Sequence, residues 1–100
     1  MSVQIRFSSD QLAVLCRKWQ VRELALFGSA VRPDFRADSD VDVLVTFEPD
    51  ARWDLWELGE MAEELVGLFG RDVDLVEERS LVNPYRRRAI LRDKQVVYAA

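Results

Sequence analysis

Residues 26–47 read LFGSAVRPDFRADSDVDVLVTF, and this stretch decides the fold. Its second half, Val41 to Phe47, is β-branched and alternating, which is typical of a strand. Its first residues complete the short apolar segment 21–27, which ends at Gly28. A glycine directly after an apolar segment indicates a strand that runs into a turn. The stretch therefore predicts two strands joined by a turn and a loop.

Outside this stretch, apolar periodicity and capping residues predict three helices and two further strands. The first helix is expected to begin at Ser8 or Ser9 and to carry its apolar stripe to Trp19. We expect a second helix opened by Pro49 and Asp50 and closed by Gly70, a third from Asn83 to about Leu91, and strands over residues 73–76 and 95–98, the last at an edge. The order α-β-β-α-β-α-β predicts an α/β (α+β) fold: a small mixed β-sheet with helices packed mainly on one face, in a single domain of residues 1–100.

Composition limits the chemistry that the chain can perform. There is no histidine, and Cys16 is the only cysteine, which excludes Ser-His, Cys-His and multi-cysteine zinc sites. The formal net charge of −4 argues against a general nucleic-acid-binding protein, for which a basic surface is expected. No apolar run approaches the roughly 18 residues that span a membrane, and the first residues do not resemble a signal peptide. We therefore expect a soluble, cytoplasmic protein that works with carboxylates, hydroxyls, amines and backbone groups.

Acidic side chains gather on one expected face of the sheet. Because side chains alternate along a strand, Asp40 and Asp42 point to the same face, which is the one that the core does not use. Asp74 has the same alternation in the later strand and would lie beside them if the two strands are neighbours. Crowded carboxylates repel one another, and a divalent cation such as Mg²⁺ removes that penalty. Two such ions would suit an in-line phosphoryl displacement.

The turn before these acids supplies a second signal. By itself, an Asp-x-Asp pattern is most often a solvated strand face, and Gly28-Ser29 is most often an ordinary turn. Together they form a narrower pattern, Gly-Ser, ten residues, then Asp-x-Asp. Glycine lets the backbone approach a ligand closely, and Ser29 can offer its hydroxyl and amide to phosphate oxygens. The combination favours a phosphate-binding turn beside a pair of metal-binding acids.

The stretch LFGSAVRPDFRADSDVDVLVTF resembles the signature of the nucleotidyltransferase superfamily that includes DNA polymerase beta. The small size and the later VDLV at residues 73–76 are similar to the minimal, single-domain (MNT) branch of that superfamily. The resemblance extends to NPYRRRAIL at residues 83–91 and so covers most of the chain. Many relatives have glycine where this chain has Pro33, which leaves the geometry of the following loop open.

The resemblance also implies roles for individual residues. By analogy with the family, Asp40 and Asp42 hold both Mg²⁺ ions, and Asp74 holds the catalytic one and helps to activate the attacking hydroxyl. Gly28 and Ser29 bind the triphosphate of the donor, which is ATP on family grounds.

Several neighbouring residues have two interpretations at this stage. Arg32 and Arg36 lie in the loop before the acids and either bind phosphates or are solvated. Ser39 either orients Asp40 through a local hydrogen bond or is a plain turn residue. The basic run at residues 86–88 spans nearly a helical turn, so its three arginines cannot all face one ligand. It either forms a solvated helix start that pairs with nearby glutamates or contacts a partner or RNA.

The resemblance implies an enzyme that moves a nucleoside monophosphate, AMP from ATP, to a hydroxyl group and releases pyrophosphate. Relatives in the minimal branch act as antitoxins that adenylylate a tyrosine of HEPN-domain ribonuclease toxins, which implies a HEPN-domain partner and an oligomer formed with it. The alternative is a binding module that neutralises its partner by occlusion and has no activity. A small-molecule nucleotidyltransferase would need an added substrate domain, for which 100 residues leave no room.

Overall fold

The computed structural model of the chain describes residues 5–33 and 39–100. Its helices are α1 (Ser9–Lys18), α2 (Leu55–Phe69) and α3 (Pro84–Asp93), and its strands are β1 (Val21–Phe27), β2 (Val41–Phe47), β3 (Val73–Glu77) and β4 (Gln95–Ala99). Two 3₁₀ turns, η1 (Gly28–Val31) and η2 (Glu78–Ser80), follow β1 and β3. The expected order α-β-β-α-β-α-β is confirmed.

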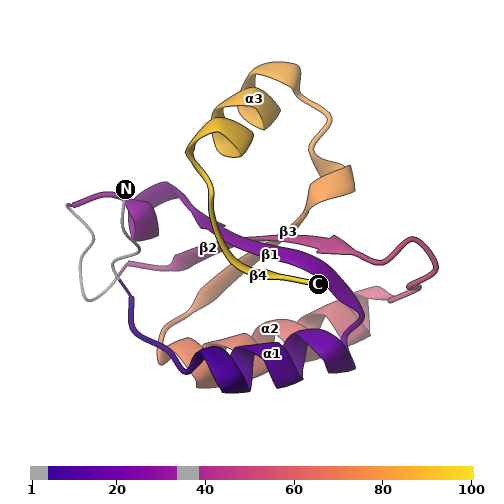
Figure 1. Ribbon diagram of the computed structural model, residues 1–100. Coiled ribbons are helices and arrows are strands. Elements are labelled where there is room, and N and C mark those ends of the chain that lie inside the picture. The colour runs from indigo at the N-terminus through magenta and orange to yellow at the C-terminus, as the bar shows by residue number, and fades with distance from the viewer. Residues whose placement is uncertain (1–4, 34–38) are drawn as a thin grey trace.

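The four strands form one mixed sheet in the order β3-β2-β1-β4. β1 is antiparallel to β2 and to β4, whereas β2 and β3 are parallel and are connected through α2. The helices α1 and α2 cover one face of the sheet, and α3 lies over the other (Figure 1). The small mixed sheet with helices mainly on one face is confirmed, and so is the edge position of β4.

The larger core lies between the sheet and the helices α1 and α2. The alternate side chains of β2 that were expected to be buried all face this core: Val41, Val43, Val45 and Phe47. They pack with buried residues of the two helices, among them Leu12, Cys16, Met61 and Leu65. Full burial of each aliphatic side chain contributes roughly 1.5–3 kcal/mol, so this face fixes the register of β2.

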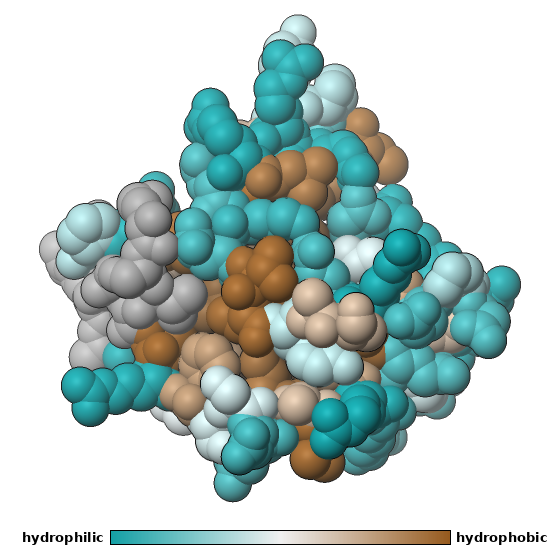
Figure 2. All heavy atoms as spheres, viewed as in Figure 1, coloured by the Kyte–Doolittle hydropathy of each residue, from teal (hydrophilic) through white to brown (hydrophobic). Residues whose placement is uncertain are grey.

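The opposite face of the sheet carries a second, smaller core. Its buried members are Ala25, Phe27, Leu44, Leu81 and Ile90, which come from β1, β2, the segment before α3, and α3 itself. The expectation that the core does not use the face with the acids is therefore wrong. Ile90 buries the inner side of α3 against that face, and Leu81 anchors the segment before the helix there. The outer surface of α3, at the top of Figure 2, is mostly hydrophilic.

The helix boundaries follow local capping chemistry. Ser8 caps α1 as expected, because its side chain accepts a hydrogen bond of 3.2 Å from the backbone N–H of Gln11. The expected start of the second helix at Pro49 and Asp50 is wrong, because Asp54 caps α2 in a reciprocal capping box with Glu57.

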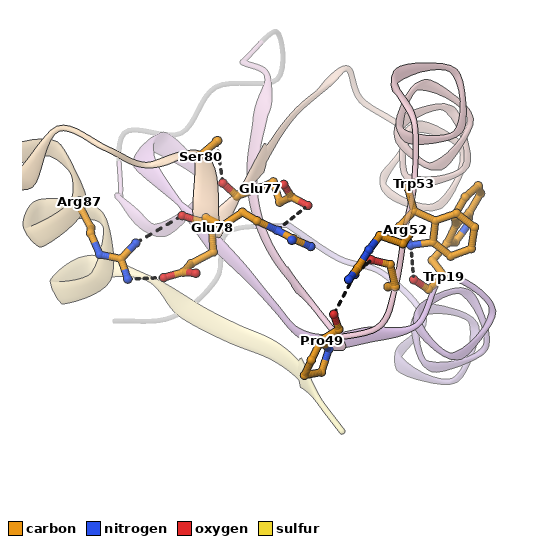
Figure 3. Close-up of polar contacts among 10 residues, drawn as sticks. Trp19, Pro49, Arg52, Trp53, Glu77, Glu78, Ser80 and Arg87 are labelled. Atoms are coloured by element: carbon orange, nitrogen blue, oxygen red, sulfur yellow. Dashed lines mark hydrogen bonds and ion pairs between the residues drawn. The ribbon is translucent and has the colours of Figure 1, made fainter.

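The segment that leads into α2 packs against the larger core and does not form a helix. Ala51 is buried in the larger core. Trp53 stacks edge-on against Trp19, with ring centroids 4.9 Å apart, and its indole N–H donates to the carbonyl oxygen of Trp19 at 3.0 Å (Figure 3). At the other end of α2, Gly70 adopts the left-handed conformation of a helix C-cap, as the sequence predicts. Within the described part of the chain, no helix is both long enough and apolar enough to cross a membrane.

Candidate active site

The parallel pairing of β2 with β3 brings the two predicted acids side by side. Asp42 and Asp74 are direct partners in the register of the two strands, and Phe27 of β1 is the partner of Asp42 on its other side. Directly paired residues point to the same face of a sheet, so Asp42, Asp74 and the buried Phe27 share the face that α3 covers. Asp40 lies just before β2, two residues from Asp42. The expectation that Asp74 lies beside Asp42 is confirmed.

Gly28 closes the site from the side of β1. It begins the turn η1 with φ of 66°, a conformation that costs other residues roughly 1–2 kcal/mol. A methyl group at this position would overlap Oδ2 of Asp42 and lie 3.2 Å from its carboxyl carbon. The backbone of Gly28 therefore lies directly against the Asp42 carboxylate, and Ser29, half-buried, is the next residue of the turn.

The charges around Asp42 are unbalanced. Partial burial raises the pKa of the Asp42 carboxyl above its ordinary value, and the negative charges of Asp74 and Asp40 raise it further. The guanidinium groups of Arg32 and Arg86 act in the opposite direction but do not reverse the shift. The folded protein thus carries a concentration of negative charge that a bound cation would offset.

The donor set of this site suits Mg²⁺, which prefers carboxylate oxygens combined with substrate phosphates. Over residues 5–33 and 39–100, no three acidic or cysteine side chains converge closely enough to form a ready-made metal site. Asp40 and Asp74 are both exposed, so their side chains can turn toward a cation without breaking the core. The acids match the ion in chemistry, and their carboxylates would have to turn toward it when it binds.

Two other predicted residues, Arg32 and Ser39, lie near these acids. Arg32 is exposed, and its charge acts on Asp42 and also on Asp93 near the end of α3. Ser39 and Asp40 line a surface hollow of about 540 Å³, together with the C-terminal part of α2 and the residues that follow it, Val66, Gly67, Gly70, Arg71 and Asp72. Arg36, the other predicted phosphate contact, lies outside the described residues.

The three consecutive arginines of α3 have different surroundings. Arg87 pairs with the Glu78 carboxylate and donates a second hydrogen bond of 3.3 Å to the Glu78 carbonyl oxygen (Figure 3). The predicted pairing of this run with a nearby glutamate is therefore confirmed for Arg87. Arg86 lies within electrostatic reach of Asp42 instead. The sequence did not single out Arg86, because three adjacent arginines give no signal of which one faces the acids.

Comparison with known proteins agrees with this geometry. The model of the nucleotidyltransferase domain family matches residues 9–97. The chain belongs to the nucleotidyltransferase family. The protein adenylyltransferase MntA of Thermococcus cleftensis is 39% identical over 84 residues, which cover 84% of this chain and 80% of the relative. The protein is thus a nucleotidyltransferase, and its sequence is similar to that of a protein adenylyltransferase.

Solved structures show the same fold. A structure described as a minimal nucleotidyltransferase superimposes with a TM-score of 0.71 at 34% identity, over 87% of this chain and 86% of that chain. A chain in the structure of a tri-AMPylated Shewanella oneidensis HEPN toxin in complex with MNT antitoxin has a TM-score of 0.65 at 21% identity, over 92% of this chain and 70% of that chain. The resemblance to the minimal branch of the nucleotidyltransferases is confirmed.

Proposed function

We propose that this nucleotidyltransferase transfers AMP from ATP to a hydroxyl group of a partner protein in a Mg²⁺-dependent reaction. The observation that carries the proposal is the meeting of Asp42 with Asp74 in strand register and with the backbone of Gly28. Acids from two strands beside a glycine turn provide a place for a triphosphate and for the ions that accompany it.

In the reaction, the acceptor oxygen forms a bond to the α-phosphorus of ATP, and the bond from that phosphorus to the bridging α–β oxygen breaks. Pyrophosphate leaves, and Asp74 accepts or relays the hydroxyl proton. Asp40, Asp42 and Asp74 would hold two Mg²⁺ ions, which stabilise the charge that develops on the transferring phosphoryl group. Gly28 and Ser29 hold the triphosphate through backbone and hydroxyl groups, because the absent side chain at Gly28 leaves the backbone accessible. Ser39 and Arg32, at the rim, complete the contacts to the nucleotide.

The partner that we propose is a HEPN-domain protein, with which the chain would act as an antitoxin. The support is the similarity to a protein adenylyltransferase and to a chain from a complex with an AMPylated HEPN toxin. The net charge of −4 disfavours nucleic acid in this role. We place the reaction in the cytoplasm, where the unpaired Cys16 is stable as a thiol.

The test is transfer of label from α-³²P-ATP to a purified HEPN-domain protein, with Mg²⁺ present. The wild type should label the partner, whereas Asp42→Asn and Asp74→Asn should reduce labelling by at least 100-fold, since each removes a carboxylate from the reacting centre. The matched control is Asp50→Asn, an exposed acid in the connection between β2 and α2. It should label at the wild-type rate.

The same variants distinguish transfer from occlusion. If Asp42→Asn still neutralises the HEPN protein as well as the wild type does, the chain acts by binding alone and the proposed transfer is wrong. If neutralisation disappears together with labelling, while the complex still forms on size-exclusion chromatography, covalent modification is the mechanism.

A further inference from the structure

The first turn of α3 places one arginine over the candidate active site. Residues three and four apart lie on one side of a helix, so Arg86 and Arg87 both share a side with Ile90. Ile90 is buried against the sheet in the smaller core, together with Phe27. That side of the helix therefore faces the sheet at the end of β1, where Gly28 and Asp42 lie.

The three arginines point in different directions around α3. Arg87 turns toward β3 and η2 and is paired with Glu78. Arg88 is about 200° around the helix from Ile90, at 100° per residue, so it points away from the sheet. It is exposed. Arg86 is left on the side of the acids, and none of the ion pairs among the described residues uses it.

The helix that carries Arg86 also packs against the predicted phosphate-binding turn. α3 contacts η1, the turn that begins with Gly28 and Ser29. Asn83 fixes the start of the helix, because its side chain accepts hydrogen bonds from the backbone N–H groups of Tyr85 and Arg86 at 3.0 and 3.1 Å. The first turn that carries this guanidinium is thus a rigid support, in contact with the glycine turn and within electrostatic reach of Asp42.

We propose that Arg86 binds the β- and γ-phosphates of the nucleotide and is a substrate-binding residue of this nucleotidyltransferase. The inference rests on the proposed function, because it takes the ligand of the acids to be a nucleoside triphosphate. Arginine matches pairs of phosphate oxygens with two parallel N–H donors, and it stays charged at every working pH. The acids hold the reacting end of the nucleotide and η1 its triphosphate, so a cation on the helix that packs against η1 meets the part that leaves as pyrophosphate.

The experiment is calorimetric titration of the full chain, with Mg²⁺, by an ATP analogue that has a methylene group in place of the α–β bridging oxygen. Hydrogen bonds to charged groups contribute more to the binding free energy than neutral ones. Arg86→Gln should therefore weaken binding of the analogue by roughly 10- to 100-fold. Affinity for AMP, measured by competition at millimolar concentration, should change by less than about twofold, since AMP lacks the outer phosphates. Arg86→Lys, which keeps the charge but loses the paired donors, should fall between wild type and Arg86→Gln.

Arg88→Gln is the matched control, since it removes the same charge two residues away on the outer side of the helix. It should bind the analogue within about twofold of the wild type. Equal affinities of Arg86→Gln and Arg88→Gln would overturn the inference, and so would an equal loss for AMP and the analogue. If the wild type itself does not bind the analogue, the proposed function fails instead. A lower free energy of unfolding for Arg86→Gln with unchanged affinity would show a purely structural residue.

Discussion

Replacement of Gly28 by alanine tests the contact between the turn and the acids. The residue has a positive φ of 66°, and an added methyl group would overlap the carboxylate oxygen of Asp42. Two costs therefore add in Gly28→Ala: the strain of an L-residue in the left-handed region and the displacement of Asp42. The second cost exists only because the two segments touch.

The structure offers a control for each cost. Gly70 has nearly the same φ, 70°, but a methyl group there meets nothing within 4 Å, so Gly70→Ala measures strain alone, roughly 1–2 kcal/mol. Gly28→Ala should lose an additional 1–3 kcal/mol, roughly, from overpacking. When Asp42→Ala is combined with Gly28→Ala, the overlapping oxygen is absent and only the strain remains. The β-carbon of Asp42 is 3.6 Å from the added methyl, an ordinary contact.

The assay is urea unfolding of the two single variants and the double variant, followed by circular dichroism. The coupling free energy of the cycle should be about 1–3 kcal/mol. For a domain of this size, each kcal/mol lowers the melting temperature by about 4–8 °C. Additive effects of the two substitutions, together with equal losses in Gly28→Ala and Gly70→Ala, would refute the close approach of η1 to Asp42.

Three further predictions concern charge, capping and burial. Because the pKa of Asp42 is raised, its carboxyl holds a proton more tightly in the folded protein than in the unfolded chain. The folded protein therefore loses stability as the pH rises through the range in which Asp42 ionises. Metal-free Asp42→Asn should therefore be at least as stable as the wild type at pH 7, by urea unfolding, with the gain disappearing below about pH 3; a less stable variant at pH 7 would contradict the charge argument. Asp54→Ala removes the capping box of α2 and should cost about 1 kcal/mol in the same assay, and an unchanged midpoint would show that Glu57 alone suffices. Burial raises the pKa of Cys16 to about 12, so a thiol reagent at pH 8 should label this side chain only at the rate at which the protein unfolds. Labelling within seconds under native conditions would mean that the larger core is open at Cys16.

The sequence predicts most of this fold because its signals are local. The alternation in residues 41–47 identifies both the face of β2 that enters the larger core and the face of the acids. The glycines at the ends of β1 and α2 mark positions that adopt a positive φ. The start of α2 is different: Trp53 and Ala51 pack against distant residues, and this tertiary use of the segment moves the helix start to Leu55. Local capping signals contain no information about such contacts.

The candidate site is only partly predictable from the sequence, because its residues meet through tertiary contacts. Alternation shows that Asp42 and Asp74 each face away from the larger core, but only the pairing of β2 with β3 makes them neighbours. The role of α3 depends on which face of the sheet it covers, and Ile90 alone does not specify that from sequence. Arg86 therefore becomes distinguishable from its two neighbours only when the position of the helix is known.

The most direct test of the account is the melting temperature with and without Mg²⁺ and ATP, because a ligand that binds only the folded state stabilises it. At a ligand concentration of about 100 times Kd, the stabilisation is roughly 2.7 kcal/mol, or about 10–20 °C for this size of domain. Such a rise is expected for the wild type and for Asp50→Asn, only when Mg²⁺ and ATP are both present, and little or none is expected for Asp74→Asn. An equal rise in Asp74→Asn, or none in the wild type, would contradict a single cation-dependent nucleotide site formed by β2, β3 and η1.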